Sequence, residues 1–310
     1  MSVTILDGKK TAARLRAQTG ERVAAHRTAG HRAPGLAVVL TGDNAASQVY
    51  VRSKVRACAE AGIQSFENYL PAAVGQEELL RLVKSLNARD EVDGILIQLP
   101  LPAPLDAQPL IDLLDPVKDI DGFTAENAGR LLQGRNGHRP CTPAGVMELL
   151  REYGVPLAGR RVVVVGRSNI VGKPMAQLLM QADATVTVAH SRTVDLAKLC
   201  REAEIVVAAL GRPASLSADY FAEGAIAIDV GINRVTQSAL VDEWFPGDAA
   251  RRAGFDKTGS MLVGDIDPRA FAKLAAYTPV PGGVGPLTIA MLLHNTLAAY
   301  EHRLGIAKLF

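Results

Sequence analysis

Short apolar runs rich in β-branched residues alternate along the chain with amphipathic stretches of helical length. In the first half these runs are Gly35–Leu40, Ile63–Tyr69 and Gly94–Leu99. In the second half they are Arg161–Val165, Thr185–Ala189, Glu204–Ala209 and Ala225–Asp229. Strands and helices in repeated alternation are typical of parallel sheets joined by crossover helices. The pattern therefore predicts two α/β domains, with a boundary near residues 140–150.

Further helices flank these runs. A polar stretch from about Gly8 to Ala29 carries apolar residues on one face only, and a second helix is predicted to start at Cys141-Thr142-Pro143, with Thr142 as its N-cap. A Pro/Gly loop, Pro279–Pro286, precedes an amphipathic helix from Leu287 to about Arg303. The chain is thus expected to end in a helix that lies outside both strand series.

The segment Arg161–Gly172 predicts a nucleotide-binding turn. A buried strand ends at Gly166, and Gly172 opens the next helix, an arrangement that places phosphate oxygens at a helix N-terminus. The usual G-x-G-x-x-G spacing is absent, and glycines serve turns so freely that Gly166 and Gly172 alone could be structural. The strand, turn and helix in sequence favour the nucleotide site.

The end of the following strand indicates NADP rather than NAD. NAD enzymes usually place a carboxylate there to hold the ribose hydroxyls, whereas this chain has His190-Ser191-Arg192. A hydroxyl and a guanidinium favour a 2′-phosphate, and Arg167 in the first loop could reach the same group. The alternative, that Arg167 and Arg192 are solvated surface charges, stays open at this point.

Composition narrows the classes of function. A net charge of +2, without a Lys/Arg run, gives no support to nucleic-acid binding. The three cysteines are odd in number and far apart, which is typical of reduced thiols. Neither a signal-peptide pattern nor a long apolar run occurs. The expectation is a soluble, cytoplasmic protein with no membrane partner and no metal site.

The first domain offers candidate chemistry on one helix. Tyr50 and Lys54 are four residues apart and share a helical face, and a desolvated lysine could move protons near neutral pH. Such a pair is more often only a solvated surface. Gln98 ends a buried strand, where open α/β sheets bind ligands. Asp119 and Asp121 add carboxylates, although aspartates before glycine are also ordinary turn formers.

Taken in order, these segments resemble one family, the bifunctional methylenetetrahydrofolate dehydrogenase/methenyltetrahydrofolate cyclohydrolases. The resemblance runs from Ile5-Leu6-Asp7-Gly8 to the last helix. The other segments that carry it are Ser47-x-x-Tyr50-x-x-x-Lys54, Val92–Pro102, Lys118–Gly122, Pro140–Pro143, Val165–Ser168, Asp229–Asn233 and Pro279–Pro286. Each is weak alone, but their order over nearly the whole chain is specific.

The resemblance implies an α/β fold of two domains. A folate-binding catalytic domain with a parallel sheet would span residues 1–141, and a Rossmann-like NADP-binding domain residues 142–284. A C-terminal helix, residues 285–310, would return to the catalytic domain. The implied enzyme oxidises methylene-tetrahydrofolate to the methenyl form with NADP+, hydrolyses that product to formyl-tetrahydrofolate, and forms a homodimer.

By the same resemblance, Lys54 is the central catalytic residue, and Gln98 holds its amine by a hydrogen bond. Tyr50, with Ser47 on the same helix, contacts the folate, and Asp121 accepts hydrogen bonds from the pterin. The residues implied to line the folate site from the Pro/Gly loop are Pro279 and Gly283. Those implied to hold NADP are Gly166, Arg167, Ser168, Ser191, Arg192 and Ile232.

One stretch departs from the family's pattern. Between Asn233 and Val263 the family usually has a short hairpin-like connection, whereas this chain has a much longer one that includes Trp244. A solvent-exposed insertion is one explanation, since loops tolerate added length. A contact with the cofactor or a subunit interface is the other, and the insertion puts Ile232 as a cofactor contact in doubt.

Two other functions stay open on the sequence. An NADP-dependent dehydrogenase of the amino-acid or shikimate type also joins a substrate domain to a Rossmann domain, but it is not expected to carry Tyr50, Lys54, Gln98 and the Pro/Gly loop together. A non-catalytic NADP-binding scaffold would be expected to lose the lysine, and Lys54 is present.

Overall fold

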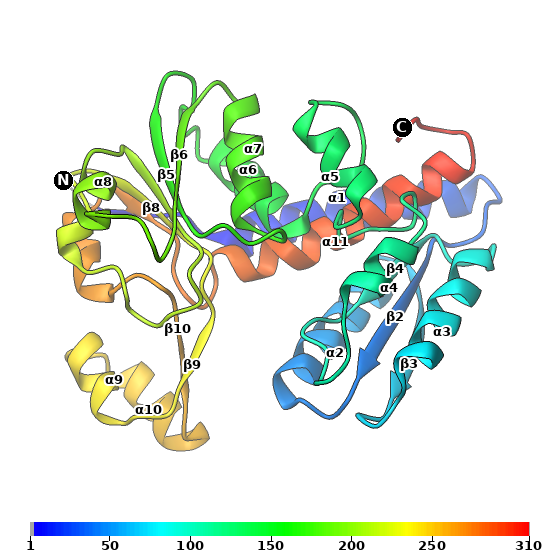
Figure 1. The fold of residues 1–310 in the computed structure, drawn as a ribbon, viewed down its shortest axis with the longest axis horizontal. Helices are drawn as coiled ribbons and strands as arrows, with labels where there is room; N and C mark the ends of the chain where they lie inside the picture. The colour runs from blue at the N-terminus through cyan, green and yellow to red at the C-terminus, as the bar shows by residue number, and fades with distance from the viewer. Residues whose placement is uncertain (1–2, 310) are drawn as a thin grey trace. The chain divides into compact units, whose positions relative to one another are not determined.

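The computed structural model describes residues 3–309, and every side chain among them except that of Ala46. It divides the chain into two compact units (Figure 1). One contains the residues up to Thr11 together with Thr142–Thr288, and the other contains Ala12–Cys141 with the residues from Ile289 on. Each unit is built on its own parallel sheet, so the predicted two-domain α/β class is confirmed.

The smaller sheet has three parallel strands in the order β3 (Gln64–Leu70), β2 (Gly35–Thr41) and β4 (Gly94–Ile97). The helices of this unit that follow the strands are α2 (Ala45–Glu60), α3 (Gln76–Ala88), α4 (Gln108–Leu113) and α5 (Ala125–Leu132). All seven residues of β2 are buried, as expected for a central strand covered on both faces. Strands β3 and β4 lie on opposite sides of β2, so the order in which strands are added to the sheet reverses at β2. The carboxyl end of β2 is therefore the switch point of this sheet.

The larger sheet has six strands, and their pairing is parallel throughout. Their order is β1 (Thr4–Ile5), β11 (Ala276–Tyr277), β8 (Ile226–Asp229), β7 (Ile205–Ala208), β5 (Arg161–Val165) and β6 (Thr185–Ala189). The associated helices are α6 (Cys141–Glu152), α7 (Gly172–Gln181), α8 (Leu196–Arg201) and the 3₁₀ turns η1 (Ala218–Tyr220) and η2 (Pro268–Lys273). Strand β5 separates β6 from β7, which makes its carboxyl end the reversal point of this sheet.

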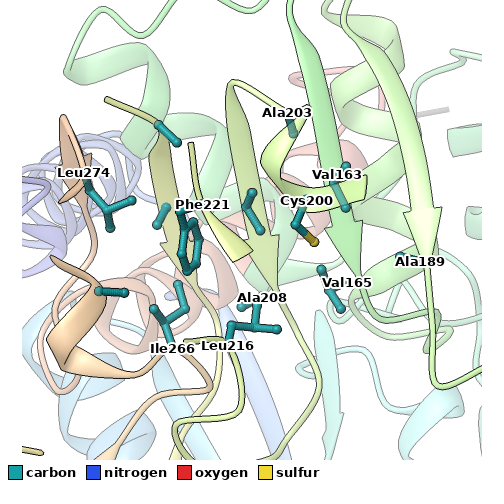
Figure 2. Close-up of a cluster of buried hydrophobic side chains, with 14 residues drawn as sticks. Val163, Val165, Ala189, Cys200, Ala203, Ala208, Leu216, Phe221, Ile266 and Leu274 are labelled. Carbon is teal, nitrogen blue, oxygen red and sulfur yellow. The ribbon is translucent and has the colours of Figure 1, made fainter. Parts of the chain in front are cut away.

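A compact apolar core is formed by side chains of this sheet and of its connections (Figure 2). Small and branched side chains from the strands, such as Val163 and Val165, pack with Phe221, Ile266 and Leu274 from the connections. Phe221 is fully buried, and removing a buried aromatic ring of this kind costs about 3–5 kcal/mol. This core holds the strand ends, and therefore the loops that follow them, in fixed positions.

Two long helices belong to both units. Helix α1 (Gly8–Thr28) begins in one unit and continues in the other, and so does α11 (Val284–Arg303). From Ile289 on, α11 packs with the elements of residues 12–141: Asn295 donates to the Ile120 carbonyl at 2.7 Å, and the Tyr300 hydroxyl to the Arg32 carbonyl at 2.7 Å. The predicted return of the C-terminal helix to the first half of the chain is thus confirmed.

The start of α6 differs from the prediction. The helix begins at Cys141, so Thr142 lies inside it and is not its N-cap. The Thr142 hydroxyl instead pairs with the Thr288 hydroxyl of α11 at 2.8 Å. A tertiary hydrogen bond that the local sequence could not show has replaced the local one.

The long connection between β8 and β11 has regular structure of its own. Strands β9 (Asn233–Val235) and β10 (Met261–Val263) form an antiparallel pair, with α9 (Ala239–Trp244) and α10 (Ala249–Thr258) between them (Figure 1). Five apolar residues of this segment are buried together: Val235, Val241, Phe255, Met261 and Val263. The segment is therefore folded, with a small core of its own, and is not an extended surface loop.

Candidate active site

Helix α2 carries the predicted lysine. Asn44 caps the helix, because its side chain accepts from the Ser47 backbone N–H at 3.0 Å, and Gly42 before it has a φ of +81° that favours glycine. Lys54 lies three turns further along and is only 7% exposed, as is Ser47. Tyr50 is half-buried on the same helix, and burial raises the pKa of its phenol. The interpretation of this helix face as merely solvated is wrong.

Strand β4 brings Gln98 to the lysine. The Lys54 amine donates to Gln98 Oε1 at 3.0 Å, and the Gln98 amide donates in turn to the Leu99 carbonyl at 2.7 Å. The second bond fixes which way the Gln98 amide faces, so its oxygen is the atom that meets the lysine. The Lys54 amine has three N–H donors, so the bond to Gln98 leaves two of them for other partners.

Asp121 completes a group that we call the lysine cluster: Lys54, Gln98, Asp121 and Cys141. Burial raises the pKa of the Asp121 carboxyl to about 6, the positive charge of Lys54 lowers it, and the neighbouring Asp119 raises it. The Cys141 thiol lies beside Asp121 and donates to the Ile120 carbonyl at 3.3 Å; burial raises its pKa well above the usual value. Cys141 was quoted in a motif but not predicted as a site residue, and only its spatial neighbours show its place.

The two aspartates of Lys118–Gly122 differ in role. Asp119 is fully buried, and its oxygens accept from the Phe123 N–H at 3.1 Å, the Thr124 N–H at 2.7 Å and the Asn127 amide at 2.9 Å. Its capacity is spent on holding the turn. Asp121 instead lies near Lys54 and Cys141; burial raises its pKa, and the charge of Lys54 lowers it.

The predicted nucleotide turn closes around two glycines. Gly166 has a φ of +141°, and a Cβ there would lie 2.3 Å from the Ala209 carbonyl oxygen. A Cβ on Gly172 would lie 2.2 Å from the Gly166 oxygen. The Ser168 hydroxyl accepts from the Val171 and Gly172 N–H groups at 3.2 and 3.3 Å, which leaves its own hydrogen to donate. Any side chain at either glycine would fill the space of this turn.

A cavity of about 530 Å³ opens at the carboxyl ends of β5, β6 and β7, and we call it the nucleotide pocket. Arg167, Ser168 and Ser191 line it, together with Arg212 from the loop after β7. The turn after β6 is fixed by the Thr193 hydroxyl, which accepts from the His190 N–H at 2.9 Å. Size, position at the reversal point of the sheet and two guanidiniums fit a phosphorylated dinucleotide.

Two predicted cofactor residues lie apart from this pocket. Within the described chain, Arg192 follows Ser191 in the turn without lining the cavity, and its side chain is exposed. Ile232 is 42% exposed and lies between β8 and β9. In contrast, Arg212 lines the pocket and was not predicted, because nothing in its sequence neighbourhood marks it.

Two buried aspartates hold the loops around the pocket. Asp265 is fully buried and accepts from the backbone N–H groups of Leu210, Gly211 and Arg212 at 2.6, 2.9 and 2.9 Å. Asp229 accepts from the Gly231, Asp265 and Ile266 N–H groups, each at 2.9 Å. Burial raises the Asp229 pKa to about 7. These carboxylates orient backbone and do not face the pocket.

Pro279 and Gly283 are in the Pro/Gly loop between β11 and α11. The Gly283 N–H donates to the Pro279 carbonyl at 2.7 Å, and the Lys9 N–H donates to the Gly282 carbonyl at 3.1 Å. A Cβ at Gly8 would lie 1.7 Å from the Gly283 oxygen, so the start of α1 touches the loop backbone to backbone. The loop is therefore tightly packed despite its composition.

Two family profiles match the chain. The profile described as tetrahydrofolate dehydrogenase/cyclohydrolase, catalytic domain, matches residues 6–121. The profile described as tetrahydrofolate dehydrogenase/cyclohydrolase, NAD(P)-binding domain, matches residues 140–304.

Full-length relatives agree with both profiles. A bifunctional protein FolD from Koribacter versatilis is 51% identical over 305 residues, covering 98% of this chain and 99% of the relative. A bifunctional protein FolD 3 from Rhizorhabdus wittichii is 54% identical over 307 residues, covering 98% and 94%. The crystal structure of the bifunctional enzyme FolD from Campylobacter jejuni has a TM-score of 0.88 at 41% identity, covering 97% of this chain and 100% of that one.

Other two-domain dehydrogenases resemble the chain in fold alone. Shikimate dehydrogenase from Aquifex aeolicus has a TM-score of 0.51 at 13% identity. The general architecture is shared with that class, but the identity over the whole length is with the FolD proteins. The chain belongs to the tetrahydrofolate dehydrogenase/cyclohydrolase family.

Proposed function

We propose that the protein oxidises methylene-tetrahydrofolate with NADP+ and then hydrolyses the methenyl product to formyl-tetrahydrofolate. Membership of the family supports both activities, and a tetrahydrofolate substrate follows from it. The single observation that supports this assignment best is the lysine cluster, in which a buried Lys54 amine is held by Gln98 beside the carboxyl of Asp121. A scaffold protein has no use for a desolvated lysine so arranged.

Lys54 acts as the proton carrier. Hydrolysis adds water to the methenyl carbon, breaks one of its two C–N bonds and releases a proton, so a group that moves protons at that carbon is required. Gln98 holds the lysine through the bond to Oε1 and so leaves its other N–H directions toward the substrate. The step balances with water alone.

Tyr50, Ser47 and Asp121 bind the folate. Tyr50 is half-buried and presents a flat amphipathic ring, which suits stacking on an aromatic ring system. Asp121 accepts hydrogen bonds from the amino-pyrimidine edge, whose two donors match two carboxylate oxygens. Pro279 and Gly283 contribute from the Pro/Gly loop. These roles come from the family resemblance and are supported by the burial of the side chains.

NADP is held by the nucleotide pocket and supplies the acceptor for hydride from the methylene carbon. The glycine pair lets phosphate approach the turn after β5, and Ser168 has a hydrogen to donate. Arg167 and Ser191 line the pocket and favour a 2′-phosphate. Arg192 and Ile232, which do not line the described pocket, are proposed as further cofactor contacts. Among known structures, the Trypanosoma brucei enzyme, described as complexed with NADP cofactor and inhibitor, has a TM-score of 0.88 at 40% identity.

The domain roles follow the same assignment. Residues 1–141 are proposed as the folate-binding catalytic domain, 142–284 as the NADP-binding domain and 285–310 as the returning helix; the described residues up to Thr11 group with Thr142–Thr288, where β1 pairs with β11. A homodimer is proposed through the NADP-binding domain. Strand β6 is at the edge of the six-stranded sheet and exposes Val188 (40%), with Val194 (83%) in the turn that follows. Edge strands with exposed apolar side chains are typical sites of pairing with a second chain.

Location and other partners remain predictions. No helix among residues 3–309 is both long enough and apolar enough to cross a membrane. Cys58, Cys141 and Cys200 are buried free thiols. The cytoplasmic location and the expectation of no nucleic-acid partner stay as predicted from the sequence.

The function is tested by a spectroscopic assay of methylene-tetrahydrofolate oxidation with NADP+ and NAD+ side by side, followed by hydrolysis of supplied methenyl-tetrahydrofolate. We expect turnover in both assays and a preference for NADP+. Absence of turnover with either cofactor would favour the scaffold. A preference for NAD+ would overturn the roles given to Arg167 and Ser191.

A further inference from the structure

The segment Asn233–Val263, which we call the bracing segment, is joined to the Pro/Gly loop by Arg251. The Arg251 guanidinium lies 3.8 Å from the centre of the Phe245 ring. Its Nη2 donates to the Val280 carbonyl at 3.0 Å and its Nη1 to the Leu262 carbonyl at 3.5 Å. One side chain thus links α10, the end of α9, β10 and the loop.

Asp248 and the Phe245 ring hold the Arg251 guanidinium in position. Asp248 Oδ2 lies 3.5 Å from Arg251 Nε, and Asp248 also caps α10 by accepting from the Arg251 N–H at 3.0 Å. A planar cation stacked on an aromatic ring loses little freedom when it adds a hydrogen bond. The Phe245 ring itself packs, with Trp244, against the apolar cluster of the bracing segment.

The Val280 carbonyl, which accepts the bond from Arg251, lies between two prolines of the Pro/Gly loop. Val280 lies between Pro279 and Pro281, and neither proline has an N–H to anchor the backbone. On the far side of Val280 the loop is held by the bond from Lys9 to Gly282 and the contact of Gly8 with Gly283. At Val280 itself, the charge-assisted bond from Arg251 holds the backbone.

We propose that Arg251 is a positioning residue for the tetrahydrofolate substrate: through the Val280 carbonyl it sets the conformation of the loop that carries Pro279 and Gly283. The inference rests on the proposed function, because it depends on those two residues lining the folate site. It gives the long connection between β8 and β11 a role in substrate binding. Arg251 acts on the loop and takes no part in the chemistry.

The neighbouring Arg252 provides a matched control. It is partly exposed, pairs with Asp242 at 3.0 Å and Asp256 at 3.2 Å, and donates to the Ser238 carbonyl at 3.4 Å. Arg251→Met and Arg252→Met remove the same charge from adjacent positions of one helix, and methionine keeps much of the aliphatic stem. Only the first removes a bond to the Pro/Gly loop.

The test compares steady-state kinetics of the wild type, Arg251→Met, Arg251→Lys and Arg252→Met, with NADP+ affinity and Trp244 fluorescence measured for each. We expect Arg251→Met to raise the KM for methylene-tetrahydrofolate about tenfold, the effect of one bond to a charged donor. The values of kcat, the Kd of NADP+ and the Trp244 emission should stay within about twofold of wild type. Arg251→Lys, which keeps the charge without the planar fork, should recover part of the loss, and Arg252→Met should match the wild type.

Two outcomes overturn the inference while leaving the proposed function intact: equal KM values for Arg251→Met and Arg252→Met, or a raised KM accompanied by an equal loss of NADP+ affinity and altered Trp244 emission, which is unfolding of the segment. If Arg251→Met does not fold, Phe245→Leu is tested instead, because it removes the ring that holds the guanidinium and retains the positive charge. A raised KM at unchanged NADP+ affinity then supports the inference. An unchanged KM overturns it. A wild type that does not turn over methylene-tetrahydrofolate overturns the proposed function itself, and with it this inference.

Discussion

The lysine cluster and the nucleotide pocket are both at the carboxyl ends of parallel strands, yet they are built in opposite ways. In the cluster the side chains are preformed: Lys54 is 7% exposed and is already bonded to Gln98. In the pocket the backbone is preformed by Gly166, Gly172 and the carboxylate of Asp265, while the Arg167 and Ser191 side chains are exposed.

The difference follows from what each site has to do. Proton transfer depends on the placement of the group that carries the proton, so that side chain is held in position in advance. Binding a phosphorylated cofactor depends on close backbone approach and on cations that can adapt to it. Substitution of Lys54 should therefore change catalysis, and substitutions in the pocket should change cofactor affinity.

The largest effect is expected from Lys54→Met. Removal of the proton carrier should lower the cyclohydrolase kcat by about 10²–10⁴-fold, the usual contribution of a general acid–base group. The Kd of NADP+, measured by fluorescence titration, should stay within about twofold. Lys84→Met, which changes an exposed lysine of α3, serves as the control. Retained hydrolysis in Lys54→Met would contradict the assignment of the lysine.

Gly166→Ala should be the next largest. The added Cβ would meet the Ala209 carbonyl at 2.3 Å, in a backbone conformation that L-residues rarely adopt, with a strain of about 1–3 kcal/mol. We expect weaker NADP+ binding by calorimetry and a lower melting temperature, with the methenyl hydrolysis rate little changed. Gly254→Ala, with open space around it, is the control. Unaltered NADP+ affinity would show that this turn does not approach the cofactor.

Asp121 should give the cluster a pH signature. Its raised pKa of about 6 means that the carboxylate is protonated as the pH falls through 6, so the KM for tetrahydrofolate substrates should rise there. Because the native pKa exceeds the reference of 3.8, protonation adds stability: this group's contribution to the free energy of unfolding increases as the pH falls from above 6 to below 4.

The loss of binding at low pH should therefore occur without a loss of folded structure that this group causes. Measurement of KM between pH 5 and 8, with circular dichroism at each pH, checks it. In Asp121→Asn the step in KM should vanish. A step that persists in that variant assigns the titration to another group.

The smallest effect is expected in the pocket's side chains. Arg167→Ala or Ser191→Ala should reduce the preference for NADP+ over NAD+ by about tenfold, because each removes one exposed bond to a phosphate. Arg192→Ala, whose side chain does not line the described pocket, should reduce it less. The ratio of kcat/KM for the two cofactors measures this directly. An Arg192 effect larger than that of Arg167 would mean that the turn after β6 moves when the cofactor binds.

Much of the fold could be predicted because its signals are local. A buried strand such as Gly35–Thr41 is a continuous apolar run, and a glycine that ends a strand marks a turn wherever it occurs. The pair Tyr50 and Lys54 could be placed on one face from helical spacing alone. The start of α6 was placed wrongly because the Thr142 hydroxyl has a tertiary partner, Thr288, in a distant helix.

The different roles of Asp119 and Asp121 could not be predicted from the sequence. The sequence Lys118–Gly122 does not distinguish the two carboxylates. In the folded turn, Asp119 accepts from backbone N–H groups, whereas Asp121 lies beside Lys54. Arg212 and Arg251 were not predicted for the same reason. Their partners lie in other elements, so no spacing along the chain reports them.

The sequence by itself determined the alternation of strands and helices, the glycine turn after β5, the absence of a carboxylate after β6 and the residues available for chemistry, since these depend on neighbours in the chain. The tertiary structure decided which of those residues are buried and which atoms they meet. Desolvation and hydrogen-bond geometry arise only when segments far apart in sequence pack together, and these two properties distinguish the lysine cluster from an ordinary helix surface.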